Sequence, residues 1–366
     1  MTGAAPTIGV EEEFLVVDDT GHLSYQGGGL ASDDTDLAGE FQKELVRCQV
    51  EVTTPICVDA AEVLDHLAEL RAAMAGRAAA KGLRLLPSGT PVLAQPDRPP
   101  ITPGPRYLRM AEWFGEVAHT SNTCGCHVHV AIPDRAAGVR VINRVRAWLP
   151  VLLALSSNSP FDKGRDTAYH SWRYIQWSHW PTAGPPPVFG SLDEYESSVA
   201  GMLRTGAMMD RGMLYWDIRL SEHQPTLEFR VCDTVVAPGT AALVAALARG
   251  LVVMALNAGG DAGSPMPTEV LAANLWRTAR DGLPGRSLHP VTGDLVGVWD
   301  QVRDLVELVG PDLDSAGDLD LVHAELAALR ESGSGAQRQR AAHRRGDLDD
   351  VVAALAIEGV PAASGG

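Results

Sequence analysis

Lysine is almost absent from this sequence. Among its 366 residues only Lys43, Lys81 and Lys163 are lysines, so the 30 basic residues include 27 arginines, against 46 acidic residues and a formal net charge of −16. Binding of nucleic acid requires clustered positive charge, so this composition argues against a nucleic-acid partner. No lysine lies in the GxxxxGK(S/T) pattern of a P-loop. If the protein handles nucleotide phosphates, metal ions and arginines must neutralise their charge.

The sequence also lacks a disulfide framework, a leader segment and an obvious membrane span. An odd number of cysteines in a long chain predicts reduced thiols. The N-terminal residues MTGAAPTIGVEEEF have neither the basic nor the apolar region of a signal peptide. The longest apolar stretch, 236–257, contains Arg249 and predicts a buried helix. We therefore expect a cytoplasmic protein without a membrane partner. The five cysteines are Cys48, Cys57, Cys124, Cys126 and Cys232.

The chain is long enough to bury a substantial core in one or two domains. Strand-like patterns concentrate in residues 1–233, and helical patterns dominate residues 234–330. The polar, basic segment 331–346 (ESGSGAQRQRAAHRRG) predicts a flexible linker before a terminal helix at 347–358. Because no linker separates the strand-rich part from the helical part, we expect a single α+β domain over 1–366, with a mainly antiparallel sheet.

Individual elements are predicted from local signals. Asp59 and Glu62 form a capping-box pattern before an apolar periodicity, and Gly82 supplies a stop, so a helix is predicted at 60–81. The remaining patterns predict a helix at 140–155, strands at 213–220 and 226–231, and proline-rich loops at 95–106 and 181–190.

Four short strand-like segments each carry ionisable residues on one face. Side chains alternate along a strand, so in IGVEEEF the carboxylates of Glu11 and Glu13 share the face opposite Glu12. QVEVTTP, CGCHVHVAI and TLEFRV show the same arrangement. Their polar faces carry Glu51 and Thr53, His127 and His129, and Glu228 and Arg230. If the four strands lie in one sheet, its open face gathers carboxylates, imidazoles and an arginine.

Two interpretations fit these strands. The polar face of an amphipathic antiparallel strand usually faces water. However, neighbouring like charges cost free energy, so three consecutive glutamates need a cation or a basic partner. The pair His127 and His129 beside carboxylate-bearing strands favours a metal site, and carboxylates suit Mg²⁺ or Mn²⁺ better than zinc. Spacing alone leaves both interpretations open.

Residues 165–187 concentrate polar and aromatic groups, including three of the eight tryptophans. This segment reads either as a packed aromatic hairpin or as a substrate wall in which Arg173 or Arg165 binds a carboxylate through its planar guanidinium. Asp217 and Arg219 repeat the pattern further along the chain. For each of these arginines a surface salt bridge remains an alternative.

Five segments in this order resemble motifs of the carboxylate–amine ligases, also called the glutamate–cysteine ligase type 2 family: IGVEEEF, VEVTTP, TCGCHVHVAI, DTAYHSWRYIQWSHWPTAGPPP and LEFRVCD. The resemblance implies a glutamine synthetase-like fold, in which a curved antiparallel sheet forms an ATP- and metal-binding funnel with helices outside. It also implies an ATP-dependent ligase that joins an acid, by default glutamate, to cysteine or another amine through an acyl phosphate. Mg²⁺ or Mn²⁺ would be the cofactor, and a homodimer is expected by analogy.

The resemblance also implies roles for individual residues. The expected metal ligands are Glu11, Glu13, Glu51, His127 and Glu228. Arg173 is similar to the arginine that binds the substrate carboxylate, and Arg230 to a phosphate-facing arginine; both are the expected catalytic residues. His129 is expected near ATP, as a ligand or a nucleotide contact. From the polar segments described above, and not from the resemblance, Arg165, Thr53 and Arg219 are further expected near the substrate. Two other functions stay open: a divalent-metal amide hydrolase using the same face, and a non-catalytic homologue that binds nucleotide or a small acid.

Overall fold

A seven-stranded antiparallel sheet lies at the centre of the fold. The computed structural model describes residues 5–31, 38–95, 98–120, 122–258 and 266–359. The strand order is β2-β3-β1-β5-β9-β8, with β4 also paired to β1. The mixed α+β class with a mainly antiparallel sheet is thereby confirmed. The strands of this sheet are β1 (Ile8–Val17), β2 (Glu40–Lys43), β3 (Gln49–Thr53), β4 (Arg84–Leu86), β5 (Gly125–Ala131), β8 (Ile218–Leu220) and β9 (Thr226–Asp233). Two hairpins pair β6 (Phe161–Asp162) with β7 (Arg165–Asp166) and β10 (Arg286–Leu288) with β11 (Leu295–Gly297).

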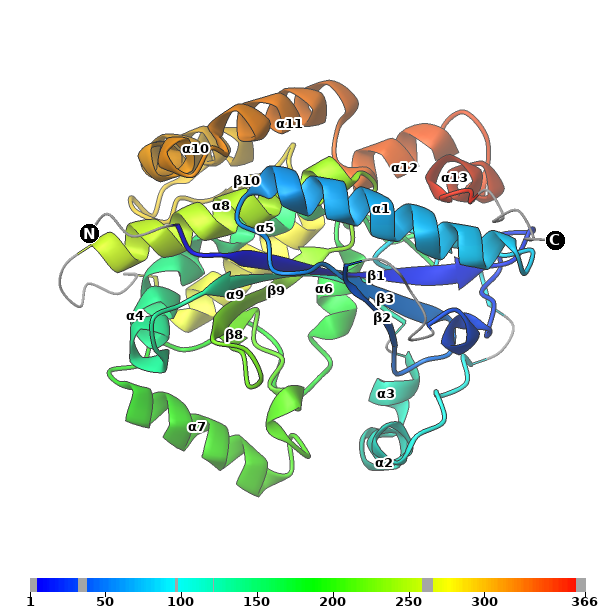
Figure 1. The fold of residues 1–366 in the computed structure, drawn as a ribbon, viewed down its shortest axis with the longest axis horizontal. Coiled ribbons are helices and arrows are strands. Elements are labelled where there is room, and N and C mark those ends of the chain that lie inside the picture. The colour runs from blue at the N-terminus through cyan, green and yellow to red at the C-terminus, as the bar shows by residue number, and fades with distance from the viewer. Residues whose placement is uncertain (1–4, 32–37, 96–97, 121, 259–265, 360–366) are drawn as a thin grey trace.

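Helices cover one face of the sheet in two layers (Figure 1). Helices α1 (Ala60–Ala79) and α8 (Pro238–Asn257) pack directly on it, and α10 to α13 lie outside them. Helices α2, α3 and α7 project from the opposite side (Figure 1). The remaining helices are α2 (Pro105–Phe114), α3 (Glu116–Thr120), α4 (Arg135–Val145), α5 (Leu149–Ser156), α6 (Trp172–Trp177), α7 (Leu192–Thr205), α9 (Thr268–Asp281), α10 (Val298–Ser315), α11 (Leu319–Ser332), α12 (Gly335–His343) and α13 (Leu348–Leu355). Three-residue 3₁₀ turns occupy Gly27–Gly29, Arg146–Trp148 and Arg211–Met213.

Helix α8 is the central core helix. Among the described residues it alone has the length and apolar composition to cross a membrane, but 78% of its most apolar window is buried inside the protein. Its Arg249 forms a buried ion pair with Asp318, whose other carboxylate oxygen accepts a hydrogen bond from the backbone N–H of Ala60 at 2.9 Å. The predicted buried helix is confirmed, and its one charged residue ties α8 to the start of α1.

Two predicted helices differ in detail from those observed. The Asp59 carboxylate accepts the N–H of Glu62 as expected, but the Glu62 carboxylate accepts the N–H of Val58 instead of completing the capping box. Helix α1 ends at Ala79, two residues before the predicted end. The predicted helix at 140–155 is broken into α4, a 3₁₀ turn and α5, because Pro150 stands in the first turn of α5 and has no N–H to continue a helix.

Segment 331–346 is helical rather than a linker. It contains the end of α11 and all of α12, whose N-terminus is a capping box formed by Ser334 and Gln337. Gln339 is buried, and its side-chain amide donates to the backbone and side-chain oxygens of Asn158 at 2.9 and 2.8 Å. Arg340 pairs with Asp166 at 2.6 Å. The linker prediction is wrong. It rests on the average polarity of the segment, whereas the helix is held by the few of its residues that face the core.

Two loop and strand boundaries also differ. Helix α2 begins at Pro105, a residue suited to the first turn, so the predicted loop at 95–106 ends earlier; its residues 96–97 lie outside the described part of the chain. In the predicted strand 213–220 only the last three residues are strand. Asp217 instead donates its N–H to the carbonyl of Gly184 at 2.9 Å, so this stretch pairs with a loop.

Glu12 belongs to the fold and not to the polar face, as alternation predicts. It is fully buried and receives two hydrogen bonds from Arg71 of α1, at 2.7 and 2.5 Å. Removing one partner of a buried ion pair leaves an uncompensated charge, so we expect Glu12→Gln to lower the free energy of unfolding by about 3–5 kcal/mol in urea titrations. Turnover per folded molecule should stay near that of the parent. A turnover loss without lost stability would contradict this assignment.

Candidate active site

The sheet face opposite α1 and α8 collects the ionisable residues. The strand register places Glu11 opposite Thr53 of β3 and His127 of β5. It also places Glu13 opposite Glu51, and His129 opposite Glu228. Directly paired residues of antiparallel strands project from the same face. The structure therefore brings together the six carboxylate and imidazole side chains that alternation predicts on one face.

Arg230 reaches this face beside an irregularity in the sheet. Between the pairs Cys126–Cys232 and Val128–Phe229 the register of β5 and β9 shifts, which leaves Arg230 and Val231 of β9 opposite His127 alone. Such bulges re-aim side chains and recur beside active sites. The N–H of Arg230 donates to the carbonyl of Asp217 at 2.8 Å, and its guanidinium forms a buried ion pair with Glu228.

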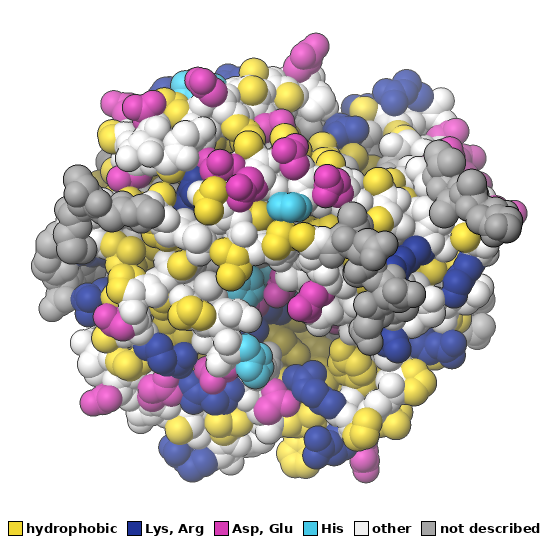
Figure 2. Space-filling view, in the orientation of Figure 1, with side chains coloured by type: hydrophobic (Ala, Val, Ile, Leu, Met, Phe, Trp, Pro, Cys, Tyr) yellow, Lys and Arg dark blue, Asp and Glu magenta, His cyan; other side chains and the backbone are white. Residues whose placement is uncertain are grey.

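A cavity of about 200 Å³ opens onto this face of the sheet. Its floor is formed by carboxylates and His127 of the sheet, and one wall by Trp177, Trp180 and Tyr215. Helix α2 supplies Arg106, Tyr107 and Met110 to another wall. Figure 2 shows a hollow on this side of the molecule, with acidic, basic and histidine side chains near its edge. The aromatic segment thus contributes both a packed cluster and a cavity wall.

Glu11 and Glu228 stay ionised because each has positive or polarisable partners. Burial opposes the charge of Glu11, but hydrogen bonds to His127 and His129, at 3.2 and 3.3 Å, lower its pKa. Burial likewise opposes the charge of Glu228, but the guanidinium of Arg230, followed by that of Arg219 at 2.7 Å, lowers its pKa well below the usual range.

Glu44 and Glu51 have the opposite behaviour. Burial, then the charges of Glu11 and Glu44, raise the pKa of Glu51 well above its usual value. Burial and the charge of Glu13 raise the pKa of Glu44 to about 8. Glu44 was missed by the strand patterns because it stands in the turn between β2 and β3, where no alternation applies. No local pattern in the sequence marks it.

Side chains that can bind a metal ion lie close together in this cluster. Three groups of residues place their ligand atoms within 4.8 Å of one another. In addition, the Nε2 atom of the buried His127 has no hydrogen-bond partner among the described residues. Burial, then the charge of Arg230, lowers the pKa of His127, which keeps the imidazole neutral and able to bind a metal. The groups are Glu11, Glu51 and His127; Glu11, His129 and Glu228; and Glu13, Glu44 and Glu51.

The stability of the metal-free protein should depend on Glu44. Its folded-state pKa is raised from 4.5 to about 8, so the folded state binds a proton more tightly than the unfolded state. Its stabilising contribution is therefore complete below pH 4.5 and is lost as the pH rises through 8. In EDTA, we expect Glu44→Gln to melt at a higher temperature than the parent at pH 8, with a smaller decline between pH 5 and 8.

The matched control for this prediction is Glu40→Gln, which removes an exposed carboxylate from the neighbouring strand β2. Its melting temperature should follow that of the parent at every pH. Identical pH profiles of the melting temperature for Glu44→Gln and the parent would contradict the raised pKa of Glu44.

Arg173 lies immediately behind the floor of the cavity. Its side chain is 1% exposed, and its Nε and Nη1 atoms have no partner among the described residues, while Nη2 donates to the carbonyl of Arg230 at 3.3 Å. A Cβ at Gly125 would clash with Nη2 and would lie 3.0 Å from His127 Nε2, so only glycine leaves room for this guanidinium. Two unused donors on a buried planar cation fit a carboxylate.

The other predicted substrate residues occupy different surroundings. Arg219 is committed to Glu228, and the hydroxyl of Thr53 donates to Glu51 at 3.5 Å, so both adjoin the cluster. Arg165 lies exposed on β7, and it is not among the residues that line the cavity. The structure therefore does not bring Arg165 to the candidate site. Arg106, Tyr107 and Tyr215 line the cavity without having been predicted, since they come from a helix and a loop without a motif.

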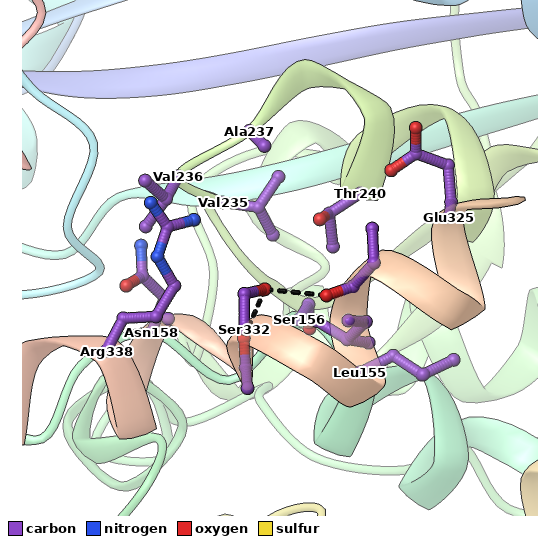
Figure 3. A pocket seen from close by; sticks show the side chains of 14 residues that line it. Leu155, Ser156, Asn158, Val235, Val236, Ala237, Thr240, Glu325, Ser332 and Arg338 are labelled. Atoms are coloured by element: carbon purple, nitrogen blue, oxygen red, sulfur yellow. Dashed lines mark hydrogen bonds between the residues drawn. The ribbon is translucent and has the colours of Figure 1, made fainter. Parts of the chain in front are cut away.

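A second cavity lies on the helical side of the molecule, between α5, α8, α11 and α12 (Figure 3). It measures about 60 Å³, and the Ser332 hydroxyl within it donates to the carbonyl of Ala328 at 2.8 Å (Figure 3). This space has room for a few waters and is too small for a nucleotide. A cavity of about 430 Å³ lies beside α4 and α7, but no carboxylate or imidazole of the described residues lines it. The cavity over the sheet, which carboxylates and His127 line, is therefore the candidate active site.

Comparisons with known sequences give one consistent result. The model of the glutamate-cysteine ligase family 2 matches residues 7–354. A protein of Rhodococcus jostii (strain RHA1) with the provisional name glutamate–cysteine ligase 2-1 is 47% identical, over 98% of this chain and 97% of its own length. One of Mycolicibacterium smegmatis, provisionally glutamate–cysteine ligase 2-3, is 41% identical over 96% of this chain and 97% of its own.

Solved structures resemble the fold at low sequence identity. A glutamate–cysteine ligase of Francisella tularensis in complex with AMP has a TM-score of 0.68 and 12% identity, over 96% of this chain and 88% of that chain. A bifunctional glutathione synthetase of Pasteurella multocida has a TM-score of 0.69 and 15% identity over 96% of this chain. The chain spans about half of that longer protein, 52% of its length. These likenesses support the fold.

Proposed function

Because the chain belongs to glutamate-cysteine ligase family 2 and is an ATP-dependent carbon–nitrogen ligase, we propose that it joins glutamate, or a similar acid, to cysteine or another amine. The observation that supports an acid substrate is the buried guanidinium of Arg173, with two donors that no described residue uses. It lies next to Gly125, whose N–H donates to Glu13 at 2.6 Å, and so adjoins the carboxylate cluster. We further propose that the sheet forms the funnel-shaped ATP site of the family, in a cytoplasmic homodimer.

The side chains present fit a divalent cation such as Mg²⁺. We propose that Glu11, Glu13, Glu51, His127 and Glu228 together hold one or more such ions, with His129 at the edge of the set. Glu44 lies within reach of the same cluster and adds a further carboxylate. Oxygen-rich ligands suit hard cations. When bound, such ions neutralise the phosphates of ATP.

The reaction that we propose has two steps. The substrate carboxylate attacks the γ-phosphoryl group, which forms an acyl phosphate and releases ADP. The amine then attacks the acyl carbon, a proton leaves the nitrogen, and phosphate departs as the amide forms. A Francisella protein of this fold was solved with AMP, which supports an adenine nucleotide as the partner of this site.

The chain's own residues act on binding, orientation and charge. Arg173 orients the acid through its free donors, and Arg230 stabilises the oxygens of the transferred phosphoryl group. Arg230 suits this role because burial opposes its charge but Glu228 more than compensates, which raises its pKa and keeps it cationic. Trp177, Trp180 and Tyr215 wall the cavity and limit the access of water to the acyl phosphate.

A single assay separates this proposal from the two other functions. The protein is incubated with Mg²⁺, ATP, L-glutamate and a panel of amines that includes cysteine, and the release of ADP and phosphate is measured. We expect release that requires both the acid and an amine. Amide cleavage without ATP would instead indicate a hydrolase, and saturable nucleotide binding without turnover a non-catalytic homologue.

A further inference from the structure

Helix α6 presents Arg173 to the site, yet it has only six residues. Isolated helices of this length are unstable in water, so other parts of the fold must hold α6 in place. It also carries Trp177, whose ring lies 5.7 Å from the guanidinium carbon of Arg173 and 5.7 Å from that of Arg230. The placement of one short helix therefore fixes both an arginine and part of a cavity wall.

A buried carboxylate anchors the start of α6. Asp233, at the end of β9, is fully buried and accepts hydrogen bonds from the hydroxyls of Ser159 and Ser171, each at 2.7 Å. Each hydroxyl also accepts a backbone N–H of the first turn of α6. Ser159 Oγ accepts the N–H of Arg173 at 3.0 Å, and Ser171 Oγ that of Tyr174 at 3.3 Å. Two serines thus connect one carboxylate to two amides of the helix.

The other contacts of Asp233 and α6 strengthen this connection. The N–H of Asn158 also donates to Asp233, at 2.9 Å, to the oxygen that accepts the Ser159 hydroxyl. The Ser171 hydroxyl uses the other oxygen, so both carboxylate oxygens have donors. The hydroxyl of Tyr174 donates to the buried Asp217 at 3.1 Å, which ties the middle of α6 to the segment before β8. Gly89 packs against the pair, since a Cβ there would lie 3.0 Å from Ser159 and 3.1 Å from Asp233. The group is enclosed on all of these sides.

We propose that Asp233, acting through Ser159 and Ser171, is the positioning group that aims Arg173 at the acid substrate. This inference rests on the proposed function only in taking Arg173 as the residue that binds the acid. Asp233 itself lies outside the lining of the cavity and touches neither substrate. Its hydrogen bonds reach α6 through the two hydroxyls, and its carboxyl group also interacts with the charge of the Arg173 guanidinium.

The experiment compares Ser159→Ala, Ser171→Ala and the double variant with Ser157→Ala. Ser157 is an equally buried serine on the same turn, but its hydroxyl donates only to the carbonyl of Ala154 at 2.9 Å. A displacement of about 1 Å at a group that positions the substrate can lower the reaction rate by about 100-fold. We therefore expect KM for the acid to rise about tenfold in each single variant and about 100-fold in the double variant. KM for ATP should change by less than about twofold, and Ser171→Thr, which keeps the hydroxyl, should restore the parent value.

Hydrogen–deuterium exchange supplies a measurement that does not depend on activity. We expect the amides of Arg173 and Tyr174 to exchange faster in the double variant and at the parent rate in Ser157→Ala. If the parent protein shows no ligase activity, the proposed function fails while the exchange data still test the anchor. Unchanged KM and unchanged exchange in the double variant would overturn the inference. So would a fall in turnover with an unchanged KM, because that result indicates lost folding alone.

Discussion

Replacing Glu11 by glutamine is expected to lower ATP-dependent turnover by about a thousandfold, because a catalytic metal ion supplies several kcal/mol of charge stabilisation and about 4 kcal/mol corresponds to that factor. Glu11, like Glu51, belongs to two of the three candidate ligand groups. Its two oxygens face His127 and His129, so a single substitution affects both groups. Mn²⁺ affinity measured by calorimetry should fall by at least about 100-fold.

The matched control for Glu11→Gln is Glu69→Gln on the outer face of α1, where the side chain is 64% exposed. This variant should keep the turnover and the Mn²⁺ affinity of the parent. Retention of full turnover by Glu11→Gln, or an unchanged Mn²⁺ affinity, would contradict the proposed role of Glu11 as a metal ligand.

Replacing Arg173 by methionine is expected to lower kcat/KM for the acid substrate by about 10²–10⁴, with KM for ATP nearly unchanged. The loss corresponds to two charge-assisted hydrogen bonds of about 1.5–3 kcal/mol each. The melting temperature is measured in parallel, because the substitution also removes a charge that faces the buried carboxyl groups of Asp217 and Asp233. The loss of kcat/KM should appear at temperatures at which the variant is fully folded, which assigns it to binding of the acid.

Arg165→Met is the informative control for Arg173. Both arginines stand in the same segment, but Arg173 is buried behind the floor of the cavity, whereas Arg165 is exposed on β7. It should show the kinetics of the parent. Equal losses in the two variants would contradict the assignment of the acid site to Arg173.

Sequence patterns predict the floor of the site well because strand alternation is a local rule. Glu11 and Glu13 share a face of β1 whatever the neighbouring strands do, and the register then adds Glu51, His127 and Glu228. The separate orientation of Glu12 follows from the same rule, and its buried partner Arg71 bears it out. These residues could be predicted without knowledge of the tertiary fold.

The walls of the cavity could not be predicted in this way. Glu44 stands in a turn, and Tyr107 and Arg106 belong to a helix that reaches the site only through packing. The anchor formed by Asp233 was equally invisible, since Ser159, Ser171 and Asp233 meet through contacts between distant parts of the chain. The prediction for segment 331–346 failed because it used the average polarity of the segment. That average hides the few residues that pack against the core.

The position of α12 has a consequence for the order of synthesis. The side chain of Gln339 donates two hydrogen bonds to Asn158, and the N–H of Asn158 donates to Asp233. Helix α12 therefore supports the turn to which α6, the helix of Arg173, is anchored. A nascent chain on the ribosome has made every strand of the sheet long before Gln339 emerges. The strands can therefore pair early during translation, whereas the support of Arg173 is completed only when α12 folds back onto that turn.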